Sequence, residues 1–339
     1  MIAAEPELPP VVLQMLRNDK IFDQLGLSSA QRDQVEAVLD RVDGDWWRSR
    51  IMQDPQRIAT VQSLTLQVKT ELQGILSPES YERLLQLERQ SLGTRMFLLD
   101  SVATSLGLSP VAVERMATIA RKTDSDANEL RKRAEAGEAT SSLEPKLQEL
   151  SKREQAGVVA MLTNGQRSKI NELTGEPFSF GQLQRTLPRA PELIQTPNLW
   201  IQGQPTSLAA LRGKVVAVHV YAFQCINCQR NLPHYTAWHN DYADKGLVVI
   251  GIQSPETSGE REPSKILAAA KQEGIKYPIL FDPDSTNWQA WGTTMWPTVY
   301  LIDRQGYIRT WWQGEMNWQG NPGEQKMRGH IESLLKEPS

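Results

Sequence analysis

Two cysteines separated by two residues are the most conspicuous candidates for chemistry in this chain of 339 residues. Cys225 and Cys228, in the motif Cys-Ile-Asn-Cys, are its only cysteines, and such a pair can cycle between dithiol and disulfide. On the first turn of a helix this spacing brings the sulfurs within bonding reach, and the free N–H groups and the helix dipole favour a thiolate. We therefore expect the more exposed Cys225 to be the nucleophile and Cys228 to resolve the mixed disulfide.

The flanking sequence predicts the elements that would hold this pair. An apolar, β-branched run over residues 215–220 predicts a buried strand, and the cysteines follow where strand gives way to helix. Pro233 lies inside that predicted helix and should kink it. Residues 247–253 form a second continuous apolar run, which fits a buried parallel strand reached through a crossover helix.

The remaining elements of the second half follow from the same signals. We expect a hairpin over residues 198–204, a helix over 263–273, a strand over 277–281, a short helix over 287–291, a hairpin of strands 297–302 and 307–312, and a last helix over 322–335. The order is βαβ followed by ββα, which predicts an α/β domain with a central mixed sheet.

Several separated motifs in this half carry a family resemblance. They are CINCQRNLPHY, GLVVIGIQSPE, NWQAWGTTMWPTVYLID and the late pair Gly314-Glu315. In this order they resemble the thioredoxin superfamily, and more closely the TlpA-like, DipZ-type redoxin domains of exported bacterial proteins, over residues 191 to about 335. The resemblance implies a thioredoxin-like fold and a protein thiol-disulfide oxidoreductase that works without a cofactor, through a redox-active Cys225–Cys228 disulfide.

The same resemblance assigns roles around the cysteines. Thioredoxin-like enzymes place a cis-proline opposite the CxxC motif, and Trp296-Pro297-Thr298 matches that position. Pro297 is therefore expected at the catalytic site, and Trp296 would shield the sulfurs and offer an apolar contact to a peptide-like partner. The expected substrate-binding residues are Trp296, Thr298, Phe223 and Gln224, although many relatives have tryptophan at the position of Gln224.

The group that moves the proton of the inner thiol is left open by the sequence. Thioredoxins commonly have a buried carboxylate six positions before the first cysteine, where this chain has His219. His219 is a possible proton relay near neutral pH or a buried, hydrogen-bonded core histidine. Glu256, after the second predicted strand, and Glu315 are carboxylates that could take the catalytic or relay role. Each could equally cap a helix or pair with an arginine.

Two other functions of a CxxC motif receive less support. A structural zinc site needs four ligands in most cases. In the predicted helix, His239 lies eleven residues beyond Cys228 and His234 points to another face, so we expect no metal. A thiol peroxidase of the peroxiredoxin type would resemble its relatives in a threonine three positions before the reactive cysteine, where this chain has Ala222. Antioxidant peroxidase activity therefore stays a weaker alternative.

The composition of the chain excludes some classes of binding partner. The net charge of −3 and the absence of an extended basic stretch argue against nucleic acid, and no apolar run reaches membrane-spanning length. We expect cysteine-containing protein substrates and a separate redox partner, which could be a membrane-bound electron donor. The family resemblance favours an extracytoplasmic location, in the periplasm or cell envelope, although the first residues lack the basic and apolar regions of a signal peptide.

The first half predicts helices in a repeated arrangement. Leu-Gly-Leu-Ser occurs at residues 25–28 and 106–109, and a second pair of starts occurs at 76–77 and 162–163. Serine or threonine caps fit all four starts, two with glutamine three residues later and two followed directly by proline. Residues 1–175 are thus expected to form an all-helical domain containing two copies of one module.

A charged stretch and a linker complete this half. Residues 121–155 predict a solvent-facing helical hairpin with a break at 136–142, and residues 176–190, rich in proline and glycine, predict the linker to the redox domain at 191–339. The LSSAQ and LTNGQ segments resemble a motif of small helical periplasmic stress and chaperone-like proteins. An interaction or chaperone-like protein, in which helices bind partners and the redox domain is regulatory, is therefore the alternative function.

Overall fold

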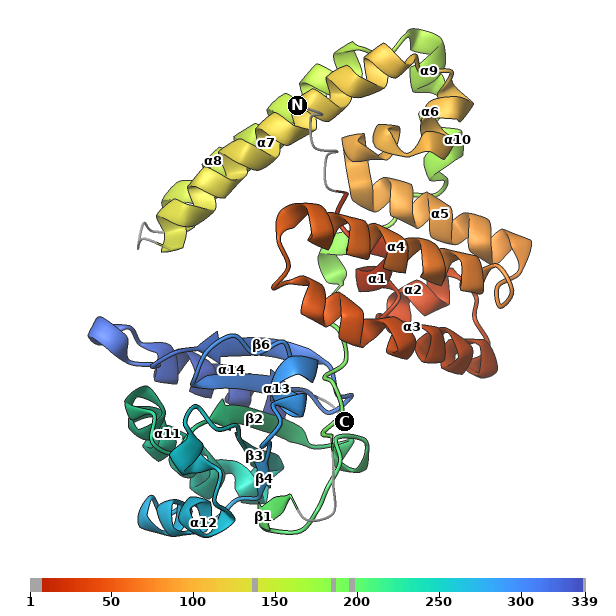
Figure 1. Ribbon diagram of the computed structural model, residues 1–339. Helices are drawn as coiled ribbons and strands as arrows, with labels where there is room; N and C mark the ends of the chain where they lie inside the picture. The colour runs from red at the N-terminus through yellow and green to blue at the C-terminus, as the bar shows by residue number, and fades with distance from the viewer. Residues whose placement is uncertain (1–7, 136–139, 184–186, 195–198, 338–339) are drawn as a thin grey trace. The chain divides into compact units, whose positions relative to one another are not determined.

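The computed structural model describes residues 8–135, 140–183, 187–194 and 199–337, which form two compact units (Figure 1). One unit comprises residues 1–38 and 61–184, and the other comprises residues 39–60 and 185–339. The last junction between the two units, at residues 184–185, falls within the predicted linker at 176–190. The segment 39–60, which the sequence places among the first-half helices, is grouped with the C-terminal unit.

Helices make up the first half, as the sequence predicts. Their bounds are α1 Val11–Met15, α2 Asp19–Gln24, α3 Ser29–Ser49, α4 Asp54–Leu72, α5 Pro78–Leu92, α6 Asp100–Leu106, α7 Pro110–Glu135, α8 Thr140–Ala160, α9 Asn164–Ser168 and α10 Ile170–Thr174, with 3-10 turns at Gly93–Leu98 and Phe180–Gln182. The predicted caps are confirmed: Ser28 and Thr163 bond reciprocally with the glutamines three residues on, and Ser77 and Ser109 accept bonds from the first turns of their helices.

One hydrogen bond recurs at equivalent positions of the two predicted copies. Ser80 Oγ donates to Leu25 O at 2.7 Å, and Gln166 Nε2 donates to Leu106 O at 3.1 Å. Each donor lies three residues after the second helix cap of its copy, and each acceptor is the first residue of a Leu-Gly-Leu-Ser segment. A bond repeated at equivalent positions is what a duplicated helical module would give.

The long helices α7 and α8 lie side by side (Figure 1). A Cβ on Gly157 of α8 would lie 3.3 Å from the Ile119 side chain of α7, so the two helices are in close contact at this glycine. Arg95, in the 3-10 turn Gly93–Leu98, pairs with Asp124 of α7 at 2.8 Å and with Glu154 of α8 at 3.0 Å, which links both helices to that turn. The pair forms the predicted hairpin; residues 136–139 of its expected break lie outside the described residues.

A mixed sheet forms the centre of the C-terminal half. Its strands are β1 Trp200–Gln202, β2 Val215–Tyr221, β3 Leu247–Gln253, β4 Ile279–Phe281, β5 Thr298–Ile302 and β6 Ile308–Gln313, in the order β1-β4-β3-β2-β5-β6. Strands β2, β3 and β4 are parallel, whereas β1, β5 and β6 run antiparallel to their neighbours. This is the predicted thioredoxin-like α/β class.

One predicted element of this sheet is wrong. The hairpin expected over residues 198–204 is a single short strand, β1, which pairs with β4 instead of with itself. Trp200 lies opposite Leu280, and Gly203 then turns the chain with a φ of +78°. Because the partner strand lies about eighty residues downstream, local sequence signals at 198–204 contain no information about the pairing.

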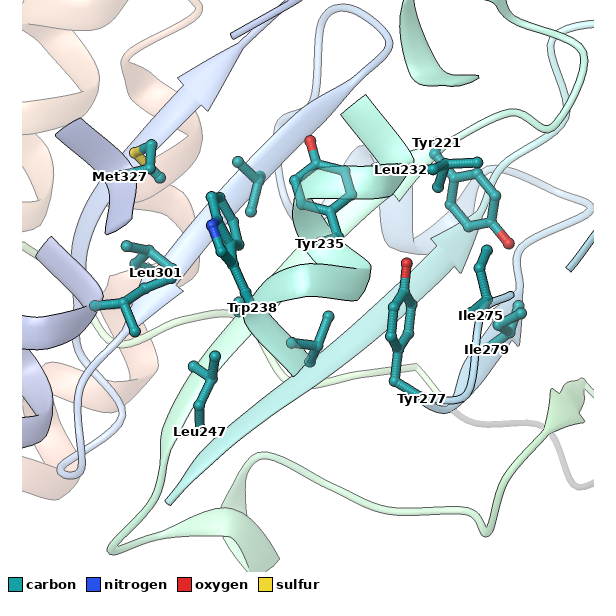
Figure 2. Packing of buried hydrophobic residues seen from close by; sticks show 14 of the residues in the cluster. Tyr221, Leu232, Tyr235, Trp238, Leu247, Ile275, Tyr277, Ile279, Leu301 and Met327 are labelled. Atoms are coloured by element: carbon teal, nitrogen blue, oxygen red, sulfur yellow. The ribbon is translucent and has the colours of Figure 1, made fainter. Parts of the chain in front are cut away.

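The side chains of β2 point alternately into two hydrophobic layers, one on each face of the sheet. One side, with Val215, Ala217 and Tyr221, packs on α11 Ile226–Tyr242, α12 Pro263–Gln272 and α14 Gly323–Lys336 (Figure 2). The other side, with Val216, Val218 and Val220, packs on α13 Thr286–Ala290, on the chain ahead of β2 and on Trp47 of α3. Both faces of the central strand are therefore buried, as its unbroken apolar sequence predicts.

Among the residues that the structure describes, no helix is both long enough and apolar enough to cross a membrane.

Candidate active site

The two cysteines lie at the start of α11, directly after the end of β2. Cys225 occupies the position that caps the helix, and its N–H donates to Ala222 O at 3.2 Å, which closes the turn from the strand. Cys225 is partly exposed, whereas the Cys228 side chain, one turn into the helix, has an exposed fraction of 0%. The predicted difference in exposure between the two thiols is present in the structure.

The surroundings separate the pKa values of the two thiols. A hydrogen bond from the Cys228 thiol, helped by backbone N–H groups of the first turn, lowers the pKa of Cys225 to about 7. Burial, and then the hydrogen bond and negative charge shared with Cys225, raise the pKa of Cys228 far above its ordinary value. At neutral pH the pair therefore holds a reactive thiolate at Cys225 and a protonated thiol at Cys228.

Strand pairing places Pro297 beside this pair. In the antiparallel ladder between β2 and β5, Val220 lies opposite Thr298, so Pro297 lies opposite the end of β2, where the chain turns toward Cys225. The Trp296–Pro297 peptide bond is cis, as the family resemblance predicts. The sheet therefore joins two sites that are about seventy residues apart in sequence.

Trp296 and Phe223 lie at the edge of the same hydrophobic cluster as the cysteines. Both are partly buried and pack, with Cys225, against the cluster that contains Cys228. The Trp296 indole N–H donates to Ser254 O at 3.0 Å, and its ring lies 4.1 Å from that of Trp288. Thr298, also expected to bind substrate, is fully buried and its hydroxyl donates to Met295 O at 2.8 Å. The Thr298 side chain therefore supports the proline loop from inside.

Glu260 is a buried carboxylate at the site that the sequence reasoning missed. It is fully buried, and its two oxygens accept the N–H groups of Gln224 at 2.7 Å, Glu256 at 2.8 Å and Thr257 at 2.9 Å. These bonds attach the residue ahead of Cys225 to the loop after β3. Thr257 and Glu260 form a capping box, and the S/T-x-x-E pattern was the available sequence signal.

Glu256, the expected catalytic carboxylate, lies on the surface of this loop. Its side chain is exposed, and its negative charge raises the pKa of Cys225, against the stronger effect of the bonds from Cys228. A carboxylate there acts on the thiol pair electrostatically. Its service as a proton relay stays a prediction.

Glu315 forms an ion pair instead of standing free. Arg230, two residues after Cys228 in α11, donates to Glu315 at 3.0 Å. The sequence left open whether Glu315 relays protons or pairs with an arginine, and this contact favours the second interpretation.

His219 lies in the central strand β2, enclosed by aromatic rings. Its ring stacks on Tyr235 at 4.3 Å and lies 4.8 Å from Tyr221 and 5.4 Å from Tyr277. Both ring nitrogens are buried without a hydrogen-bond partner among the described residues, and burial lowers the pKa to about 3. The imidazole is therefore neutral near pH 7 and a poor proton acceptor, and it is not the hydrogen-bonded core histidine that the sequence suggested.

The close fit around His219 depends on a glycine in the next strand. Gly251 of β3 pairs with His219, and a Cβ there would lie 3.0 Å from His219 Nε2. The apolar sequence of β3 is interrupted by this glycine because the imidazole fills the space of a side chain.

Among the described residues, no group of three or more His, Cys, Asp or Glu is arranged to hold a metal ion.

The dithiol lies at the start of a helix that follows β2, and the cis-proline precedes the neighbouring strand β5 of the mixed sheet. This arrangement defines a redox domain of the thioredoxin-like class. The model of the AhpC/TSA family matches residues 189–311, so the C-terminal half contains a redoxin domain of that family. The chain is similar to the protein DipZ of Mycobacterium tuberculosis, with 42% identity over 106 residues, and to the thiol-disulfide oxidoreductase ResA of Bacillus thuringiensis, with 25% identity over 119 residues.

These similarities are confined to part of each protein. The matched segments cover 31% of this chain and 15% of DipZ, and 35% of this chain and 64% of ResA. Among solved structures, a thiol-disulfide isomerase from Corynebacterium glutamicum is 25% identical, over 44% of this chain and 98% of that chain, with a TM-score of 0.38.

Proposed function

We propose that this chain is an extracytoplasmic thiol-disulfide oxidoreductase that exchanges electrons with cysteines of other proteins through Cys225 and Cys228. The observation that carries the proposal is the contrast between the two thiols: one is partly exposed with a pKa near 7, and the other is buried with a raised pKa. Dithiol exchange needs this division, because one sulfur must react with the substrate while the other is held back.

The reaction has two sulfur transfers. The Cys225 thiolate attacks one sulfur of a substrate disulfide, a mixed disulfide forms, and the other substrate sulfur leaves as a thiolate. Cys228 then loses its proton and attacks the Cys225 sulfur, which forms the Cys225–Cys228 disulfide and releases the second substrate thiolate. The substrate gains two electrons and the enzyme loses them; the reverse sequence donates a disulfide.

Formation of the mixed disulfide at Cys225 should lower the pKa of Cys228 and so favour the second sulfur transfer. In the reduced pair, the negative Cys225 is one cause of the raised pKa of Cys228. Once Cys225 is bound in a mixed disulfide, that charge is gone and the pKa of Cys228 falls toward the value set by burial alone. Cys228 therefore becomes a better nucleophile only when there is a mixed disulfide to resolve.

Resemblance to the redoxin domains of exported proteins supports the extracytoplasmic location and the use of protein substrates with a separate redox partner. Partly exposed apolar side chains beside the reactive groups support binding of peptide-like chains. Ile226 follows Cys225 and is 57% exposed, and Met295 precedes Trp296 and is 45% exposed. Both would lose contact with water when a substrate segment covers the site.

Serine variants of the two cysteines test the proposal, with insulin as a disulfide substrate and dithiothreitol as the reductant. C225S should lose insulin reduction, because the nucleophile is absent. Pre-reduced C228S mixed with insulin after removal of dithiothreitol should instead accumulate a mixed disulfide, visible on non-reducing gels, because attack proceeds without resolution. Undiminished reduction by C225S, or a mixed disulfide trapped on Cys228 in C225S, would contradict the proposal.

A further inference from the structure

The helical segment 39–60 supplies part of the core of the redox unit. Trp47 of α3 is only 2% exposed and belongs to the hydrophobic layer of Val218, Tyr300 and Trp291. Its ring makes edge contacts with Tyr300 at 5.9 Å and Trp311 at 5.2 Å. The segment therefore closes the sheet face opposite α11, although more than a hundred residues separate it from β2.

Arg50, in the same segment and directly after the end of α3, binds the main chain at Trp291 and Gly292. Its Nη2 donates to Trp291 O at 2.9 Å and to Gly292 O at 2.7 Å, and its Nη1 donates to Trp47 O at 2.8 Å. The Trp47 indole N–H donates to the same Trp291 O at 2.8 Å. One carbonyl and its neighbour thus receive three bonds from two side chains of segment 39–60.

This geometry requires a guanidinium. The planar group lies 3.6 Å from the centre of the Trp47 ring while its two terminal nitrogens reach different carbonyls, which a lysine ammonium cannot reproduce. Burial lowers the pKa of Arg50 to about 10, so the group remains charged at neutral pH. Gly292 leaves room for it: a Cβ there would lie 2.9 Å from Arg50 Nη1.

The two carbonyls that Arg50 binds belong to the first residues of the loop that ends at the candidate site. Residues 291–297 run from the end of α13 to Pro297, and further hydrogen bonds hold positions along this loop. Thr293 Oγ1 and Tyr300 Oη lie 3.0 Å apart, and Tyr300 Oη also reaches Trp291 O at 3.4 Å. The side chain of Thr294 and the carbonyl of Met295 accept bonds from Gln313 and Thr298, both at 2.8 Å, and the Trp296 indole donates to Ser254 O. Each residue from Trp291 to Trp296 other than Gly292, whose carbonyl Arg50 binds, thus has its own bond to another part of the unit.

We propose that Arg50 and Trp47 are positioning residues for the substrate-facing loop of the redox site, acting through the carbonyls of Trp291 and Gly292 on Trp296 and Pro297. This rests on the proposed thiol-disulfide exchange and adds a requirement to it. The redox domain needs segment 39–60 to hold its substrate contacts in place, whereas the chemistry of the thiols themselves depends on the α11 face.

The test uses the full-length chain with R50M and a matched control, R48M. Arg48 lies in the same segment, and its described ion pair is with Asp45 on its own helix. The first readout is the ¹H–¹⁵N resonance of the Trp296 indole, assigned by its absence in W296F. R50M should shift this resonance, R48M should leave it in place, and R50K should resemble R50M.

The second readout separates substrate docking from thiol chemistry. Loss of loop position should slow insulin reduction by R50M at least about fivefold, whereas alkylation of Cys225 by iodoacetamide should stay within about twofold of wild type. An unshifted Trp296 resonance with unchanged insulin reduction overturns the proposal. So does an equal loss in both reactions, because that pattern indicates general loosening of the fold.

Failure of the proposed function would be recognised separately. A wild-type chain that does not reduce insulin contradicts thiol-disulfide exchange, whereas the Trp296 resonance still reports whether Arg50 positions the loop. A shift in R50M alone then supports the positioning role, and no shift overturns it.

Discussion

The two faces of the sheet in the C-terminal unit differ in the side chains that they bury. The layer between the sheet and α11 contains Cys228, the uncharged His219 and four buried tyrosines, three of them around His219, so polar groups share this layer with the buried thiol. The opposite face is an apolar layer that segment 39–60 closes with Trp47. Titration should therefore affect one face, whereas the other should respond mainly to loss of packing.

Removal of Trp47 should have the largest effect on stability. W47A deletes a buried indole and its bond to Trp291 O, and such truncations cost about 3–5 kcal/mol of unfolding free energy. Chemical denaturation followed by circular dichroism measures the loss, which should be the same at pH 7.5 and pH 5.

Trp318 supplies the control for this change. It belongs to the same unit but is 55% exposed, so W318A should cost far less than W47A. Equal losses in the two variants would show that segment 39–60 is not part of the core of the redox unit.

His219 should make the stability of the α11 face depend on pH. Its pKa is about 3 in the folded chain and near 6.5 when unfolded, so the unfolded chain binds the extra proton first. The stabilising contribution is complete above pH 6.5 and is lost as the pH falls toward 3, which amounts to about 2 kcal/mol by pH 5. Denaturation of wild type and H219L at pH 7.5 and pH 5 should show a loss that is about 2 kcal/mol larger in wild type, because the remaining pH dependence is common to both chains.

Comparison of two pH values within each variant removes the cost of the cavity that leucine leaves. The same pH dependence in H219L as in wild type would contradict the neutral, enclosed histidine.

The smallest effect is expected at Glu256, on the rim of the α11 face. Its charge raises the pKa of Cys225, so E256Q should lower that pKa by a fraction of a unit and shift the pH profile of Cys225 alkylation toward acid. Glu262, which pairs with Lys265 on the surface, provides the matched control E262Q. A catalytic relay at Glu256 would instead show as slower resolution of the mixed disulfide with an unshifted alkylation profile.

Local patterns predicted much of the fold and the reactive pair. The apolar runs of β2 and β3, the helix caps and the CxxC motif are short-range signals, and the structure places the corresponding elements within a few residues of the prediction. The position of Pro297 beside the cysteines followed from family resemblance, since no local signal joins the two.

The remaining features depend on contacts between distant parts of the chain. β1 pairs with β4 and not with a neighbour in sequence, and Trp47 and Arg50 act on residues about 240 positions away. Their own sequence reads as an ordinary amphipathic helix, so nothing local distinguishes them. The sequence analysis selected Glu256 and missed Glu260. The two carboxylates differ in exposure, which the sequence does not show, and not in residue type.

The central claim is that Cys225 is the reactive thiolate and Cys228 the protected thiol. It is tested most directly by alkylation of the reduced wild-type chain with iodoacetamide across a range of pH, with each cysteine followed by mass spectrometry. Cys225 should react with a midpoint near pH 7, and Cys228 should stay unmodified throughout the range in which Cys225 titrates. Faster modification of Cys228, or a Cys225 midpoint at the ordinary thiol value of about 8.5, would contradict the account.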